Sequence, residues 1–292
     1  MDATLNSKQL KFLIEKMIDI ASDSPTYEKL AHYIEKNYLR IIFMTAGELA
    51  KEAGISQGSV SRFCIDLGYH GFNDFLRNLQ QFVSEKITAP QRLQYISLNK
   101  SDNTICNILE MEHKNINELE AIVLQPSYRA LVEKIVAAKE VVLLSARMSS
   151  TLLPYTGYIL NKIRDHVVQV TPDSAEWNTL NLRDPRETLI FAIAFPRYPN
   201  VLVNKLKELK RDGFSIAAIT DSMISPIAYM ADPIVNVPIT ISSIFDIYST
   251  PLVFLNLLLR DVAQEITGLD QRLNKLERLE ASNHIYYKNI EV

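Results

Sequence analysis

Apolar residues in the first third of the chain recur with the spacing of helices. Residues 5–20 carry one such stripe, and a second runs from Tyr27 to Tyr38. A third stripe begins at Phe75 and continues to Val83. The pattern predicts a small helical domain that packs behind the stretch from residue 45 to residue 67.

Residues 45–67 have the pattern of two short helices joined by a sharp turn. Thr45 and Glu48 have the spacing of a capping box, which marks a helix start. Gly54 stands where a left-handed turn residue is needed, and Ser56 can cap the next helix. The second helix then has apolar residues at i, i+3, i+4 and i+7, which are Val60, Phe63, Cys64 and Leu67. This arrangement fits a helix-turn-helix that reads the DNA major groove.

The other face of the second helix carries small or hydrogen-bonding side chains, which suit an approach to base edges and phosphates. We expect the DNA contacts to come from Thr45, Ser56, Gln57, Ser59, Ser61 and Arg62. The alternative is an ordinary helical hairpin that has no role in DNA binding.

The pattern changes at Val141, where short apolar runs begin to alternate with helical segments. These runs are Val141–Leu144, Val167–Val170, Leu189–Phe195, Ile216–Ile219 and Ile234–Val237. Continuous apolar strands that alternate with helices predict a parallel sheet covered on both faces. A long helical stretch follows from Ser243 to Ile266.

The predicted fold class is therefore multi-domain. An all-α helix-turn-helix domain spans residues 1–85, and a helical linker spans residues 86–127. An α/β three-layer sandwich with a parallel sheet spans residues 128–267. Residues 268–292 form an amphipathic helical tail that contacts another copy or a partner, or caps the fold.

Ligands of open parallel sheets bind outside the carboxyl ends of the strands, at a switch point of the topology. Three strand ends here carry donors that lead toward helix N-termini, where an anion is favoured. The candidate effector residues are Ser145, Arg147, Ser149, Ser150, Arg197, Tyr198, Asp221 and Ser222. A guanidinium can hold a carboxylate or phosphate with two parallel hydrogen bonds. Alternatively, the two arginines pair with acids such as Asp221 or lie in a dimer interface.

Composition modifies this picture in two ways. Hydrophobic residues make up 47% of the chain, which suits a globular protein with a sizeable core, but the formal net charge is −3. The first 85 residues carry nine Lys and Arg against eleven Asp and Glu, so the usual basic footprint of a DNA-binding domain is missing by count. Local clustering or dimerisation would have to supply it.

The sequence gives no reason to expect a metal, a cofactor or a membrane segment. Cys64 and Cys106 are the only cysteines and have no ligand spacing, and the five histidines are scattered. No signal peptide is recognisable, and no apolar run reaches the ~18 residues of a spanning helix. We expect a cytoplasmic protein.

Residues 44–75, MTAGELAKEAGISQGSVSRFCIDLGYHGFNDF, resemble the RpiR family of bacterial transcription regulators. That family shows a serine-rich recognition helix, then Arg-Phe-Cys and Leu-Gly-aromatic-x-Gly-Phe, which match Arg62–Cys64 and Leu67–Phe72. A second match covers residues 218–222, 225–228 and 231–232. The resemblance implies a helix-turn-helix domain joined to a sugar isomerase (SIS) domain whose usual ligand is a sugar phosphate.

Two loops depart from the family pattern. The first usually reads G-x-G-x-S, but here the glycine positions hold Ser145 and Arg147, and the serine is Ser149. The second usually reads S-x-S-G-x-T, but here residues 194–199 read AFPRYP, with Arg197 at the glycine position. A phosphate cradle of backbone N–H groups and hydroxyls cannot be the same here. We therefore hypothesise an anionic metabolite, a sugar phosphate or a carboxylate, held by the two arginines.

The predicted function is a DNA-binding transcriptional regulator and not an enzyme. It would bind a double-stranded operator as a homodimer or a dimer of dimers, because a two-fold protein matches a two-fold site. One alternative is a sugar-phosphate isomerase, which needs a general base; Asp221, Asp246 and Glu176 are the candidates. Another is a sheet domain that only dimerises.

Overall fold

A computed structural model describes residues 2–22, 24–83, 87–98, 104–223, 225–241 and 244–287. The chain forms two compact units. The helical unit comprises Met1–Asn115 together with Ile239–Tyr248, and the sheet unit comprises Ile116–Pro238 together with Ser249–Val292. Residues 239–248 thus group with the helical unit although they follow the last strand in the chain. The predicted domain boundaries stay a prediction.

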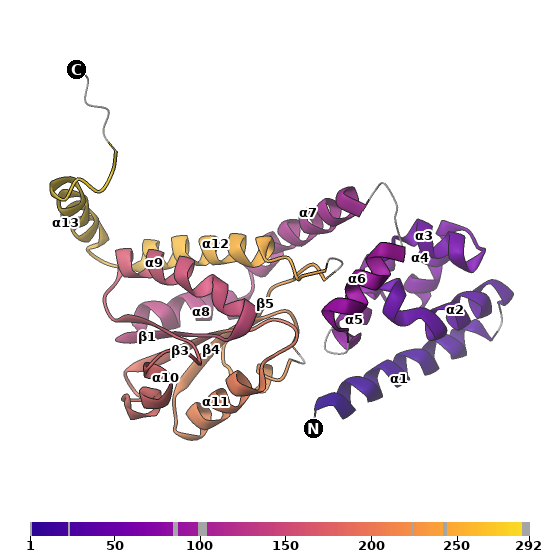
Figure 1. The fold of residues 1–292 in the computed structure, drawn as a ribbon, viewed down its shortest axis with the longest axis horizontal. Helices are drawn as coiled ribbons and strands as arrows, with labels where there is room; N and C mark the ends of the chain where they lie inside the picture. Colours follow the sequence, from indigo (N-terminus) through magenta and orange to yellow (C-terminus); the bar gives the residue numbers. More distant parts are fainter. Residues whose placement is uncertain are drawn as a thin grey trace, which may run out of the picture. The chain divides into compact units, whose positions relative to one another are not determined.

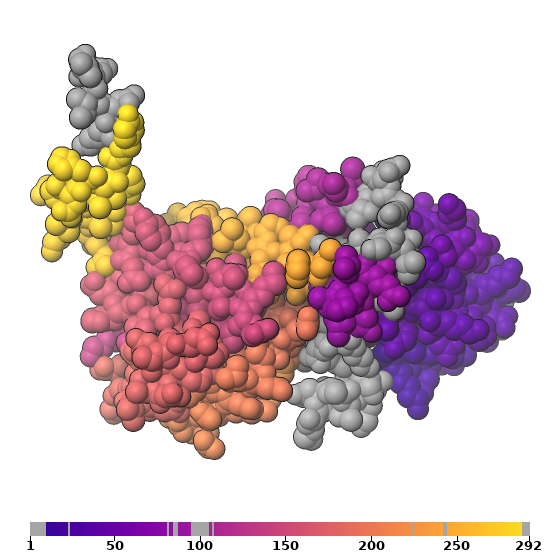
Figure 2. Space-filling model, in the orientation of Figure 1, coloured from indigo at the N-terminus to yellow at the C-terminus, as the bar shows by residue number. Residues whose placement is uncertain are grey.

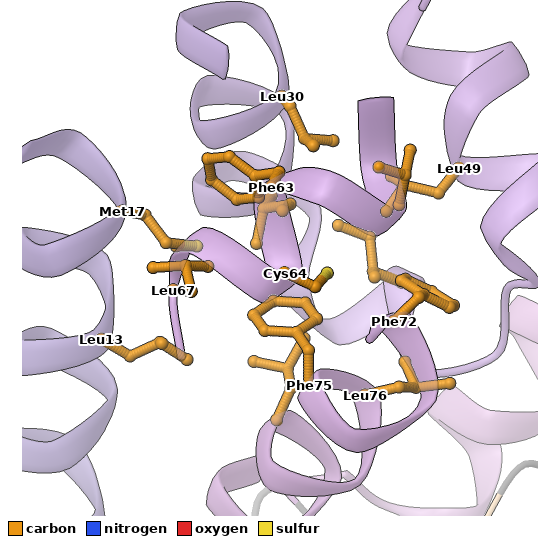
Figure 3. Close-up of a cluster of buried hydrophobic side chains, with 14 of the residues drawn as sticks. Leu13, Met17, Leu30, Leu49, Phe63, Cys64, Leu67, Phe72, Phe75 and Leu76 are labelled. Carbon is orange, nitrogen blue, oxygen red and sulfur yellow. The ribbon is translucent and has the colours of Figure 1, made fainter. Parts of the chain in front are cut away.

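The helical unit begins with five helices that share one core. They are α1 (Asp2–Ala21), α2 (Pro25–Ile41), α3 (Ala46–Ala53), α4 (Gln57–Asp66) and α5 (Phe72–Val83). Figure 3 shows side chains of α1, α2, α4 and α5 converging, with Met17, Leu30, Phe63 and Phe75 among them. All four are buried, and burying such side chains contributes about 1.5–3 kcal/mol each. The apolar stripes seen in the sequence form this core.

The helix-turn-helix pair is built by the local signals that predicted it. The Thr45 hydroxyl accepts a hydrogen bond from the Glu48 backbone, and the Glu48 carboxylate accepts one from the Thr45 backbone at 2.7 Å, which completes the capping box. Gly54 ends α3 with a φ of 67°, in the left-handed region. Ser56 caps α4. Two further helices follow in the chain, α6 (Ala89–Leu98) and α7 (Thr104–Ile122).

The sheet unit contains five parallel strands in the order β2-β1-β3-β4-β5. They are β1 (Glu140–Leu144), β2 (Val167–Val170), β3 (Thr188–Ile193), β4 (Ser215–Thr220) and β5 (Ile234–Asn236). Each lies within two residues of its predicted apolar run. The central strand β3 is buried throughout, as expected of a strand covered on both faces.

Helices cover both faces of the sheet (Figure 1). One face carries α8 (Pro126–Ala137), α9 (Leu153–Ile163) and α12 (Ser249–Glu265); the other carries α10 (Glu176–Thr179) and α11 (Asn200–Arg211). The described residues of the unit also form three short segments of 3₁₀ helix: η1 (Arg147–Leu152), η2 (Leu180–Leu182) and η3 (Ala228–Met230). Trp177, Leu206 and Ile190 belong to the core between the sheet and the second helical layer.

The helical stretch predicted from Ser243 begins later than the sequence pattern indicated. The helix α12 starts at Ser249, because Pro251 suits a first turn and because Thr240 and Ile247 pair as an antiparallel bridge. The tail forms α13 (Leu269–Ser282), none of whose residues is buried. Its atoms, in yellow, stand out at one end of the sheet unit (Figure 2). Among the described residues, no helix is long and apolar enough to cross a membrane.

One arginine of α13 closes the end of another helix. The guanidinium of Arg272 donates to the carbonyl oxygens of Asn161, Lys162 and Arg164, at 2.9–3.0 Å, and pairs with Asp165 at 2.7 Å. Asn161 and Lys162 belong to the last turn of α9 and Arg164 is its C-cap, and carbonyl groups at such an end have no partner inside the helix. The tail helix therefore completes α9.

Candidate DNA-binding face and effector site

The helix α4 presents two different faces. Val60, Phe63 and Cys64 are buried in the core, whereas Gln57 and Arg62 are exposed on the opposite side. Burial raises the pKa of the Cys64 thiol to about 12, so this residue stays a neutral core thiol. The Nε of Arg62 lies 3.3 Å from the Gly58 carbonyl oxygen, and this contact holds the side chain along the helix.

Hydroxyl side chains of the predicted DNA-binding set form hydrogen bonds at the starts of α3 and α4. Thr45 caps α3, and its hydroxyl also donates to Glu48 at 3.0 Å. The Ser56 hydroxyl accepts from the Ser59 backbone at 3.1 Å and lies 2.9 Å from the Ser59 hydroxyl. Ser61 is half-buried. Thr45 and Ser56 thus position the two helix starts, and their DNA contacts stay a prediction.

The acidic residues of the helix-turn-helix are each engaged by a donor within the helical unit. Glu48 accepts from the capping box, and Glu52 pairs with Arg40 at 3.2 Å. Asp66 accepts a hydrogen bond of 2.6 Å from the Tyr27 hydroxyl, which raises the tyrosine pKa. Each carboxylate of the helix-turn-helix is therefore held by a hydrogen bond or an ion pair from within the helical unit.

The strand order places a switch point between β1 and β3, because the chain leaves β1 for β2 and then returns to the other side of β1. The loops after these two strands are joined by two hydrogen bonds. The Ser145 hydroxyl donates to the Ile193 carbonyl at 2.6 Å, and the Phe195 N–H donates to the Ser149 hydroxyl at 3.2 Å. The sequence-predicted residues of both loops therefore lie together at this edge.

Both arginines of the candidate site have left-handed backbones. Arg147 has a φ of 58° and Arg197 a φ of 64°, and both side chains are exposed. This conformation costs a residue with a Cβ roughly 1–2 kcal/mol, which is why glycine is usual there. In the part of the chain that the structure describes, neither arginine forms an ion pair. The proposed pairing of these arginines with Asp221 is therefore not present.

Asp221 has another partner. The Tyr198 hydroxyl donates to its carboxylate and lies 3.3 Å from the hydroxyl of Thr220, a buried residue that the candidate set did not include. Asp221 and Ser222 are both buried at the end of β4. Thr220 could have been found from its place directly before Asp221 at a strand end.

The remaining predicted groups serve the local fold. The Ser150 hydroxyl donates to the Arg147 carbonyl at 2.6 Å, inside the turn η1. Asp246, considered above as a general base, lies in the helical unit, where it pairs with Arg92. Within the described ranges, no group of three or more His, Cys, Asp or Glu residues is arranged to hold a metal ion.

Two family models match the chain, and together they span most of it. Residues 12–86 match the helix-turn-helix domain of the rpiR family, and residues 134–260 match the SIS domain. An uncharacterised HTH-type transcriptional regulator of Clostridium perfringens is 25% identical over 206 residues, which cover 70% of this chain and 73% of that protein. A second, from Providencia stuartii, is 26% identical over 202 residues, which cover 67% and 69%.

Two solved structures share the fold. The sugar isomerase domain of an RpiR transcription factor from Sphaerobacter thermophilus has a TM-score of 0.55 at 21% identity and covers 61% of this chain and 99% of that one. The NanR protein of Vibrio vulnificus, complexed with ManNAc-6P, has a TM-score of 0.54 at 16% identity and covers 93% and 98%. With its helix-turn-helix unit and its SIS unit, the chain belongs to the RpiR family of DNA-binding transcriptional regulators.

Proposed function

We propose that this regulator senses a small carboxylate-bearing metabolite at the β1/β3 edge of its sheet, and that Arg147 and Arg197 bind it. The observation that carries the proposal is the pair of exposed, left-handed arginines at the ends of the two strands that flank the switch point. Strained residues of this kind persist where the surrounding structure enforces them, and they cluster at binding sites.

The hydroxyl groups at this edge favour a ligand that is held by guanidinium groups. Ser145 and Ser150 donate their hydroxyl hydrogens to backbone carbonyls, so neither is free to donate to a phosphate in this conformation. Each guanidinium instead offers a planar fork that matches a carboxylate. A phosphate also fits such a fork, and the Vibrio vulnificus relative is bound to ManNAc-6P, so sugar phosphates are the comparison ligands.

The polar groups of the site support a sensor more than an isomerase. An isomerase needs a carboxylate or histidine placed to move a proton. Asp221 already accepts a hydrogen bond from the Tyr198 hydroxyl, Asp246 belongs to the helical unit, and Glu176 begins α10, which follows β2 and not β1 or β3. We therefore propose binding without catalysis.

Calorimetry on the full chain would test the ligand class. Citrate and malate would be compared with glucose 6-phosphate and ManNAc-6P, using the wild type, Arg147→Ala and Arg197→Ala. Each substitution should weaken carboxylate binding about 10- to 150-fold, because a hydrogen bond to a charged group contributes about 1.5–3 kcal/mol. Arg211→Ala removes an exposed arginine of α11 and is the matched control. Sugar-phosphate binding that both substitutions leave unchanged would refute the proposal.

The DNA-binding face would be tested with a duplex selected from a random library by the full chain. Arg62→Ala should weaken binding by about 1–3 kcal/mol while circular dichroism and the unfolding midpoint stay unchanged, because the side chain is exposed. We propose that the selected site has two-fold symmetry, which matches a dimer. Equal duplex affinities for Arg62→Ala and the Arg211→Ala control would remove Arg62 from the interface.

A further inference from the structure

The helical unit contains an ion pair that is almost fully withdrawn from water. The Nη1 of Arg92, on α6, lies 2.5 Å from the Oδ1 of Asp246. Arg92 is 2% exposed and Asp246 is 9% exposed. Arg92 and Asp246 lie 154 positions apart in the chain. Neither residue belongs to the DNA-binding face or the effector edge described above.

Asp246 belongs to a segment that we call the strap, of which the structure describes residues 239–241 and 244–248. The strap is closed on itself, because the Ile247 N–H donates to the Thr240 carbonyl at 3.0 Å. The Asn115 side-chain amide, on α7, donates to the Thr240 hydroxyl at 2.9 Å, and both residues are buried. In the chain, the strap stands between β5 and α12 of the sheet unit, yet it packs with the helical unit.

The Arg92 guanidinium is only partly satisfied. Its Nε and Nη2 are buried and have no hydrogen-bond partner among the described residues. A buried pair must recover the free energy of leaving water through good geometry and further hydrogen bonds, and apolar residues of similar volume are often equally stable or more stable. The two open donors reduce the net stability that the pair contributes, so less free energy is lost when the pair opens than in a fully satisfied network.

We propose that Arg92 and Asp246 form a releasable latch, which ties the chain between β5 and α12 to helix α6 of the helical unit. The inference rests on the proposed function, because a latch at this point matters to a regulator whose effector edge and DNA-binding face lie in different units. Closed, the latch couples the strap to α6; open, it leaves the strap held by the hydrogen bond between Asn115 and Thr240 and by its buried side chains. A ligand-driven change of DNA affinity requires two such states with different affinities.

Hydrogen–deuterium exchange on the full chain, without ligand, tests the latch. Asp246→Asn should raise exchange at least tenfold in peptides covering α6 and the strap, and leave α4 and β3 unchanged. Lys114→Ala, which breaks an exposed ion pair with Glu110 on α7, is the control and should leave all four peptides within twofold. The double variant Arg92→Met with Asp246→Leu replaces the latch by an apolar contact and should return both peptides to wild-type rates or slower.

The same variants would then be titrated with the duplex selected by the wild type. Asp246→Asn should shift duplex affinity at least threefold, and Lys114→Ala should not. Unchanged exchange, a rise that spreads equally into α4, or unchanged duplex affinity would each overturn the latch. If Asp246→Asn does not fold, the double variant decides. Hydrogen exchange in its strap that is faster than in the wild type would then overturn the latch. If the wild type selects no duplex, the proposed function fails, and the exchange pattern alone decides on the latch.

Discussion

The left-handed backbone of Arg197 allows the fold and the ligand site to be separated by two substitutions at one position. Arg197→Gly and Arg197→Ala both remove the guanidinium, but only glycine accepts a φ of 64° without strain. The strain that glycine relieves, roughly 1–2 kcal/mol, is partly offset by its entropy, so the glycine variant should be more stable than the alanine variant by roughly 0.5–1 kcal/mol. Relative to wild type, relief of this strain is partly offset by the entropy of glycine, about 0.5–1 kcal/mol, so Arg197→Gly should be as stable or slightly more stable.

Urea unfolding followed by tryptophan fluorescence would measure the difference. Trp177 is the only tryptophan and lies in the core of the sheet unit, so its emission reports that unit alone. With an m-value of roughly 2 kcal/mol per molar urea, the two midpoints should differ by about 0.25–0.5 M. Both variants should lose the same affinity for the carboxylate ligand.

Two results would refute this reasoning. An alanine variant as stable as the glycine variant would mean that the loop after β3 does not enforce the left-handed conformation. A glycine variant that is less stable than wild type by more than 1 kcal/mol would mean that the arginine stabilises the fold itself. In the second case the exposed guanidinium would no longer indicate a ligand.

Three further changes test the physical account of the fold. Thr45→Ala removes the cap of α3 and should lower the free energy of unfolding of the helical unit by about 1 kcal/mol, measured by circular dichroism in urea. The thiol pKa is about 12 for buried Cys64 and about 8.5 in an unfolded chain, so the free energy of unfolding should fall as the pH rises above 8.5. Between pH 8 and pH 10, the wild type should lose about 2 kcal/mol more of this free energy than Cys64→Ala loses. Equal losses in the two proteins would exclude the buried thiol as the cause. A Cβ on Gly157 would lie 2.2 Å from the Gln169 amide nitrogen, so Gly157→Ala should lower the melting temperature. The second substitution Gln169→Ala should restore the melting temperature, because it removes the clashing side chain. A melting temperature that stays low in the double variant would place the clash elsewhere.

Local chemistry made much of the fold predictable. Thr45, Glu48, Gly54 and Ser56 act on neighbours within four positions, so the helix-turn-helix could be predicted and is confirmed down to its caps. The strands could also be predicted from the sequence, because a sheet covered on both faces requires apolar runs such as Leu189–Phe195. The ends of these strands also led to the candidate effector residues, whose binding role stays a prediction.

Interactions between distant parts of the chain were not predictable in the same way. The pairing of Arg92 with Asp246 gave no sequence signal, since each residue alone resembles an ordinary surface charge. The conformation of Arg147 and Arg197 is imposed by the loops around them and runs against their own preference. Ser145 looked like a ligand donor, but its hydroxyl bonds the neighbouring strand.

The arginine that closes α9 has a consequence for the order in which the chain can mature. Three carbonyl groups at the C-terminal end of α9 depend on Arg272, which is synthesised more than a hundred residues after them. Domains generally fold as units during synthesis, so this end of α9 can be closed only after residue 272 has been made. The sheet unit therefore reaches its final form late, when the tail helix docks.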